Sequence, residues 1–181
     1  MADIGHRDPG HELTVAGKGK GVEFTVDQQD MQRVAKAMRA EEDGKTLRKQ
    51  LVGELKDAVS PGVSKVQGKL RSIPHLGPTR SSPPMGSYLA SRVKPQIRLS
   101  GRSTGVAVRI AQTPALRGFK LAARRLNRSS WRRRVFGGVW VTQTSPIPGF
   151  FDDTLAEGKE QYRAGVLRAL EKMARRVARS A

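Results

Sequence analysis

Apolar residues recur at helical spacing in two stretches of the N-terminal half. The first stretch follows a short alternating segment at 22–26, which predicts a strand, and a capping Asp27; its apolar positions are Met31, Val34, Ala35 and Met38. We expect Gly44 to end that helix. The second stripe is longer and contains Pro61, so it predicts either one kinked helix or a second helix beginning at Ser60; its apolar positions are Leu47, Leu51, Leu55, Ala58, Val59, Val63, Val66 and Leu70.

Two further helices are predicted in the C-terminal half. The longer runs from about 151 to 179, and its apolar stripe is Leu155, Tyr162, Val166, Leu170, Met173, Ala174 and Val177. Its first turns are acidic and its last turns are basic, which suits the helix dipole. A shorter, basic helix within 115–134 is predicted to end at about Asn127, and its apolar face is Phe119, Ala122, Ala123 and Leu126.

Strands are predicted where apolar and polar residues alternate. The segments 96–99 and 105–110 form a predicted hairpin, with Arg98 and Arg109 on the face opposite the apolar side chains. A further strand is predicted around Trp140. The segment 72–94 is expected to be a long loop, because 72–87 contains four prolines and two glycines.

Together these elements predict a mixed α+β protein. We expect a small antiparallel sheet of three to four strands, built from the hairpin and the Trp140 strand, to pack against the long C-terminal helix and an N-terminal helical pair. The length of 181 residues fits one domain over 21–181, preceded by a flexible arm at 1–20.

Positive charge is concentrated in the middle of the chain. The sequence contains 34 Lys or Arg and 16 Asp or Glu, which gives a formal net charge of +18. The segment 58–151 has no acidic residue and 17 basic ones, so it holds +17 of that total. We call it the acid-free segment. Such a field attracts polyanions or acidic protein faces, and the alternative is a solvated basic face without a specific partner.

The residues that catalysis would need are sparse. There is no cysteine, and the three histidines have no clustered metal ligand near them in sequence: His6, His11 and His75. The glycine–lysine run at 17–21 lacks the spacing of a phosphate-binding loop. Asp152 and Asp153 form a carboxylate pair, but capping of the final helix accounts for it. We therefore expect no enzyme activity, cofactor or metal, and the lack of a leader or apolar span favours assembly in the cytoplasm.

The stretch 131–151, WRRRVFGGVWVTQTSPIPGFF, contains both tryptophans and three of the five phenylalanines. Its order predicts a strand, a proline elbow and then a helix, with the aromatic side chains filling the junction. Trp140 and Phe136 are expected in the core. Phe150 and Phe151 fit an exposed partner anchor as well as they fit a core position, because they follow the elbow directly.

The order of these motifs resembles a family of phage proteins. Arg-Arg-Val-Phe-Gly, Trp-Val-Thr-Gln, Pro-Gly-Phe-Phe and a long terminal helix are similar to the C-terminal half of the tail-completion, or head–tail joining, proteins of long-tailed bacteriophages. The resemblance is clearest over 88–181 and weaker over 22–72. It implies a structural protein of the virion neck: a ring of six copies between the head-closure or connector protein and the tail terminator or tail tube, with genomic DNA passing through.

Two other functions remain open. One is the tail terminator itself, which the sequence separates poorly from the joining ring. The other is a non-specific nucleic-acid-binding module, without the motifs of base-reading proteins, that uses the acid-free segment on phosphates. Neither a membrane nor a small-molecule substrate is expected as a partner. The candidate partner-binding residues are Arg98, Arg109, Arg124, Arg128, Arg132, Arg133, Arg134, Phe150 and Phe151.

Overall fold

The computed structural model describes residues 22–24, 28–41, 43–74, 84–100, 104–111 and 121–180. The predicted arm at 1–20 and His75 lie outside these ranges. The fold is mixed α+β, as predicted, with the elements β1 Val22–Phe24, α1 Gln28–Ala40, α2 Gly44–Arg71, α3 Met85–Ser91, β2 Val93–Arg98, β3 Gly105–Ile110, α4 Ala122–Asn127, β4 Ser130–Arg134, the 3-10 turn η1 Phe136–Gly138, β5 Trp140–Thr144, α5 Asp152–Glu157 and α6 Lys159–Ser180.

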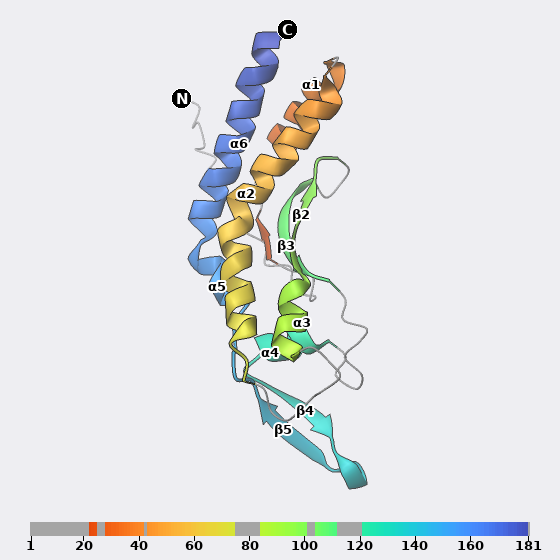
Figure 1. Ribbon diagram of the computed structural model, residues 1–181. Coiled ribbons are helices and arrows are strands. Elements are labelled where there is room, and N and C mark those ends of the chain that lie inside the picture. The colour runs from red at the N-terminus through yellow and green to blue at the C-terminus, as the bar shows by residue number, and fades with distance from the viewer. Residues whose placement is uncertain are drawn as a thin grey trace, which may run out of the picture.

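The long helix α2 is the centre of the molecule, with α6 on one side and the β2–β3 hairpin on the other (Figure 1). Its predicted stripe is confirmed, apart from the half-buried Ala58: the buried residues are Leu47, Leu51, Leu55, Val59, Gly62, Val63, Val66 and Leu70. The helix continues through Pro61 without ending. Gly62 allows a close approach to the C-terminal helix, because a Cβ there would lie 2.9 Å from the Tyr162 ring.

The C-terminal helix is divided at Gly158, although one uninterrupted helix was predicted. A Cβ at this position would lie 2.2 Å from the buried Tyr162 ring, so glycine is needed where the ring packs. Burial, followed by the negative charge of Glu157, raises the pKa of the Tyr162 hydroxyl. The other residues of the predicted apolar stripe are buried or half-buried, as expected. Ala174 is exposed instead, and Ala169, which was not in the predicted stripe, is buried.

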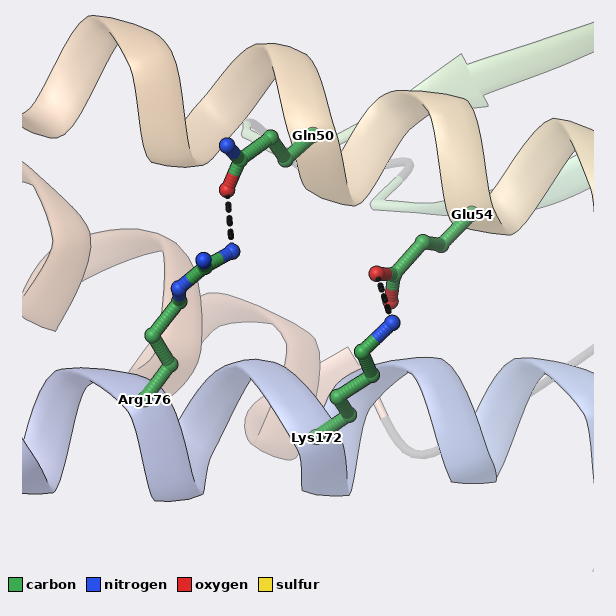
Figure 2. A network of polar contacts seen from close by, with 4 residues as sticks. All are labelled: Gln50, Glu54, Lys172 and Arg176. Carbon is green, nitrogen blue, oxygen red and sulfur yellow. Dashed lines mark hydrogen bonds and ion pairs between the residues drawn. The ribbon is translucent and has the colours of Figure 1, made fainter.

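Two polar contacts join α2 to α6 at the edge of their interface (Figure 2). Lys172 Nζ donates to Glu54 Oε1 at 2.6 Å, and Arg176 Nη1 donates to Gln50 Oε1, also at 2.6 Å. The later residue of α6 meets the earlier residue of α2, so the two helices are antiparallel. Among the described helices, none has the length and apolar character needed to cross a bilayer.

The strands form two separate sheets, whereas the sequence predicted a single one. The first sheet has the antiparallel order β1-β3-β2, with Ile97 opposite Val106 and Pro95 opposite Val108. The second consists of β4 and β5 alone in the described part of the chain. The Trp140 strand is therefore not part of the sheet that packs on α2.

Two boundaries also differ from prediction. Gly44 is the first residue of α2 instead of the end of α1, because α1 already ends at Ala40. The expected loop over 72–94 contains α3, whose buried residues Gly86, Leu89 and Ala90 pack into the core beside α2. Packing of a short apolar face thus produces a helix directly after a proline-rich segment.

Candidate functional site

The β4–β5 hairpin projects away from the helical body at the end opposite the C-terminus (Figure 1). From here on, the arm means residues 130–144, which are distinct from the predicted N-terminal arm at 1–20. Its antiparallel ladder runs from Ser130 opposite Thr144 to Arg134 opposite Trp140. Most of its residues are exposed on both strands. The arm is therefore a two-stranded ribbon that shares little of the core.

The tip of the arm is a tight turn. The Val135 N–H donates to the Val139 carbonyl oxygen at 3.0 Å, and the Gly138 N–H donates to the Val135 oxygen at 3.1 Å. Gly137 and Gly138 have φ values of 78° and 79°. These values lie in the left-handed region, where glycine avoids the steric cost that other residues incur. The glycine pair therefore sets the turn, and η1 is the short helical turn that it creates.

Side-chain hydrogen bonds join the segments that flank the arm, linking α4 to the start of α5 and Ser145 to α4. Asn127 Oδ1 accepts from the Phe151 N–H at 2.9 Å, and Asn127 Nδ2 donates to Asp152 Oδ2 at 2.5 Å. Ser145 Oγ donates to the Leu126 oxygen at 2.5 Å. Trp131, which is half-buried, packs against the core from β4. Asn127 thus serves the first turn of α5, a role predicted for Asp152 or Asp153, and it fixes where the arm leaves the body.

Trp140 lies on the surface of the arm, so its predicted core position is wrong. Its side chain is 54% exposed, and its neighbours Val139 and Val141 are 61% and 39% exposed. The guanidinium carbons of Arg132 and Arg134 lie 5.6 and 5.8 Å from the Trp140 ring centroid, within cation–π range. The physical reason is that no described layer covers the ribbon beyond its base, where Trp131 packs against the core.

The two faces of the arm carry different side chains. The ladder places Arg134 opposite Trp140 and Arg133 opposite Val141, and side chains alternate between faces along each strand. Arg132, Arg134 and Trp140 therefore share one face, which the cation–π contacts confirm. Arg133 and Val141 share the other face with Trp131, closer to the base.

The predicted partner-binding residues separate into three groups. Arg132, Arg133 and Arg134 are exposed along β4, with Arg124 and Arg128 exposed at its base. Arg98 and the half-buried Arg109 lie on the other sheet, on the face that they share with Lys94.

Phe150 and Phe151 form the third group, and they belong to the core. The two residues are 1% and 5% exposed, and their ring centroids lie 6.3 Å apart in an edge-on arrangement. The exposed-anchor interpretation of this pair is therefore wrong. The chain folds back at the elbow, where Gly149 has a φ of 66°, and this reversal directs both rings inward. The side chain of Phe136 lies outside what the structure describes.

Sequence reasoning missed the exposure of Val139, Trp140 and Val141, although a signal was present. Side chains alternate across a strand, so three consecutive arginines place charge on both of its faces. A strand such as β4, and the strand paired with it, cannot then bury either face in a core without burying charge. The triplet at 132–134 therefore indicated an uncovered ribbon.

The exposed side chains of the arm are chemically suited to contacts with other molecules. No group of three or more His, Cys, Asp or Glu that could hold a metal occurs in the described ranges. An exposed indole between two guanidinium groups can stack on planar groups, pack against apolar side chains and pair with anions. No family model, curated protein or solved structure matches this chain.

Proposed function

We propose that this protein is a structural component of a bacteriophage neck, forming a ring that joins the head connector to the tail tube. The order of motifs over 88–181, which is similar to that of tail-completion proteins, supports the proposal. The structural observation that carries it is the arm: an exposed tryptophan and two exposed valines on a ribbon fastened at its base.

The arm has the properties of a preorganised contact surface. Tryptophan is over-represented among the residues that dominate protein interfaces, and apolar side chains gathered at one place on a surface mark interaction sites. Fastening through Asn127 and Ser145 reduces the conformational entropy that a flexible loop would lose on binding. Complementary burial in the assembled neck is the mechanism, and no catalytic step or cofactor is part of it.

The ring of six copies and its neighbours come from the resemblance. One side of the ring contacts the head-closure or connector protein, and the other contacts the tail terminator or tail tube. DNA passes through the lumen, where a dense arginine lining would bind phosphates and slow its movement. We therefore expect Arg124, Arg128 and the triplet at 132–134 to face protein partners or the exterior.

The decisive experiment is to locate the chain in purified phage particles by electron cryomicroscopy and to count its copies around the tail axis. We expect one closed ring between connector and tail tube. A density map with the arm arginines pointing into the channel contradicts the expected orientation. A chain that is absent from particles contradicts the proposal itself. The closely related tail-terminator role is distinguished by position: a terminator caps the tube, and a joining protein lies between it and the head.

A second candidate function is non-specific nucleic-acid binding, which the placement of Arg132 and Arg134 around Trp140 favours. Bases stack on exposed aromatic rings with about 1–3 kcal/mol per base, and the arginines would contact phosphates. Fluorescence titration with single-stranded and double-stranded DNA separates the two functions. A phosphate binder loses affinity steeply and log-linearly as salt rises, whereas a joining protein shows weak DNA affinity at every salt concentration and assembles with virion partners.

A further inference from the structure

The arm and the helix that follows it carry opposite charge. Residues 130–144 contain three arginines and no acid, a net of +3. Residues 152–160 contain Asp152, Asp153, Glu157 and Glu160 against Lys159, a net of −3. All four carboxylates are on exposed residues. The chain therefore displays a compact basic surface and a compact acidic one on two different elements.

The acidic residues form one outward face. Thr154, Leu155 and Gly158 are buried, and Asp153 and Glu157 lie on the exposed side of α5. Further along α6, Glu160, Ala164 and Leu167 follow at steps of four and three, so they share one face. We call the surface formed by residues 152–160, together with Leu167, the acidic flank. Arg163 and Arg168 on α6 limit the extent of its negative charge.

The acidic flank also contains an exposed apolar residue. Leu167 is 38% exposed, one of the few large apolar side chains that the described residues leave in solvent. The others include Val139, Trp140 and Val141 on the arm. The arm thus combines arginines with exposed apolar side chains, and the acidic flank combines carboxylates with one exposed apolar side chain, that of Leu167.

The charges on these two surfaces are not neutralised within the described part of the chain. The described ion pairs join Arg33 to Asp30, Lys172 to Glu54 and Arg175 to Glu171. None of them includes an arginine of the arm or a carboxylate of the acidic flank. Exposed charges without a partner are ordinary singly, but a +3 and a −3 surface on one chain are complementary to each other.

We propose that the arm of one copy docks on the acidic flank of a second copy. The inference rests on the proposed function and names the contact between neighbouring subunits of its ring. The guanidinium groups of Arg132 and Arg134 meet the carboxylates of Asp153, Glu157 and Glu160, and Trp140, which shares their face of the arm, covers Leu167. Arg133, on the opposite face, adds to the positive field of the arm. A polyanion could neutralise the arm as well, but it would leave the acidic flank unused.

The occupant is a second copy because an arm cannot reach the acidic flank of its own chain. Asn127 holds the base of the arm against the start of α5, and the ribbon extends away from α5 and α6 (Figure 1). A five-residue strand is about 17 Å long, which places the tip well beyond the base. A contact between two different patches is head-to-tail, so it generates a ring when the rotation closes.

Charge reversal in the full chain tests this contact. The arm variant carries Arg132→Glu, Arg133→Glu and Arg134→Glu; the flank variant carries Asp153→Lys, Glu157→Lys and Glu160→Lys. Sedimentation analysis should show that each self-associates at least about 100-fold more weakly than the unmodified protein. A control with Lys45→Glu, Lys49→Glu and Lys56→Glu reverses three exposed charges on α2 and should assemble normally. Circular dichroism confirms folding, and Asp153→Asn, Glu157→Gln and Glu160→Gln provide a milder flank variant.

Mixing the two variants gives the sharpest result. Between two copies of the arm variant, the acidic arm repels the acidic flank; between two copies of the flank variant, the basic arm repels the basic flank. When the two variants meet, each arm faces a flank of opposite charge. An equimolar mixture should therefore restore assembly, with the two chains strictly alternating and equal in number by native mass spectrometry. Combining all six substitutions in one chain should also restore self-association. Raising the salt from about 50 to about 500 mM should weaken the contact in the unmodified protein, because the Debye length shortens severalfold.

Three outcomes overturn the inference. They are an arm variant that assembles like the unmodified protein, a mixture that fails to restore assembly, and an unmodified protein that stays monomeric at every concentration. Loss of DNA binding by the arm variant with unchanged self-association makes the arm a nucleic-acid surface instead. The proposed function is judged separately by the copies counted in particles: a ring found there with an unaffected arm variant leaves the function in place and removes only this contact.

Discussion

Valines in two strands of this molecule have opposite environments. Val106 and Val108 in β3 are completely buried, whereas Val139 and Val141 of the arm are 61% and 39% exposed. The residue type is the same, and both neighbourhoods are antiparallel hairpins. The difference lies in what covers them, because β3 has a strand on each side and α2 behind it. Alternation predicts a strand, but it does not predict the layer that packs on it.

The body and the arm are therefore stabilised in different ways. The body buries a shared core between α2, α6 and the three-stranded sheet, which the hydrophobic effect stabilises. A two-stranded hairpin alone is marginal in water. The arm depends instead on its fastened base, its glycine turn and the cation–π contacts of Trp140. Substitutions in the body should therefore lower stability more than assembly, whereas substitutions in the arm should lower assembly more than stability.

The largest effect on stability is expected from Phe150→Ala in the body. The side chain is 1% exposed, so its removal leaves a cavity and should cost about 3–5 kcal/mol of unfolding free energy. Urea denaturation followed by circular dichroism measures the change. Phe150→Leu should recover much of the loss. A Phe150→Ala protein of unchanged stability that no longer enters particles would restore the interpretation of this residue as an exposed anchor.

A moderate effect is expected at the boundary between the two regions. Asn127→Ala removes the acceptor for the Phe151 N–H and the contact to Asp152, at a cost of about 1–2 kcal/mol. The arm base should also loosen, which faster amide hydrogen exchange over 145–152 would report. Ser130→Ala, at an exposed position of β4, is the matched control and should change neither quantity. Unchanged exchange in Asn127→Ala would show that Ser145 and Trp131 suffice to hold the arm.

Trp140→Ala should cost about 1 kcal/mol or less in unfolding free energy, because the residue is exposed and loses mainly cation–π and cross-strand contacts. Its effect on self-association should be far larger than its effect on stability. Paired measurements of melting and sedimentation on Trp140→Ala and Phe150→Ala sharpen the comparison directly. A stability loss near that of Phe150→Ala would mean that the arm shares the core.

The smallest effect is expected from the polar contacts between α2 and α6. A double-mutant cycle on Glu54 and Lys172 should give a coupling of about 0.5 kcal/mol, because the Lys172 side chain is 70% exposed and solvent screens the pair. Chemical denaturation of Glu54→Gln, Lys172→Met and the double variant provides the cycle. A coupling above about 2 kcal/mol would indicate that these contacts, more than the apolar stripe, hold the two helices together.

Local pattern correctly predicted most of the elements. The apolar stripe on α2, the β2–β3 hairpin, the end of α4 at Asn127 and the strand at Trp140 all follow from short-range periodicity. β4 was missed, because its sequence SWRRR shows no alternation of apolar and polar residues and it follows a predicted basic helix. α3 was missed, because the prolines that precede Met85 predict a loop, and burial of Leu89 and Ala90 outweighs that preference.

The candidate site was predicted in part. The arginines at 132–134, named as candidate partner-binding residues, are exposed, as expected for charged side chains that rarely enter a core unpaired. Their role in binding stays a prediction. The aromatic residues were assigned less well: Trp140, expected in the core, is exposed, and Phe150 and Phe151, for which an exposed anchor and a core position fitted equally, are buried. Both positions have apolar or aromatic neighbours in sequence, so local context could not separate them.

By itself, the sequence determined the α+β class, the apolar faces of the helices and the separation of charge into a basic middle and an acidic start of the final helix. Tertiary structure decided which strands share a sheet, which aromatic residues face the core and where the arm points. The physical reason is the sequence separation over which each effect acts. Helical and strand periodicity act between neighbours a few residues apart, whereas burial depends on contacts such as Asn127 with Phe151 and Gly62 with Tyr162, which join distant segments.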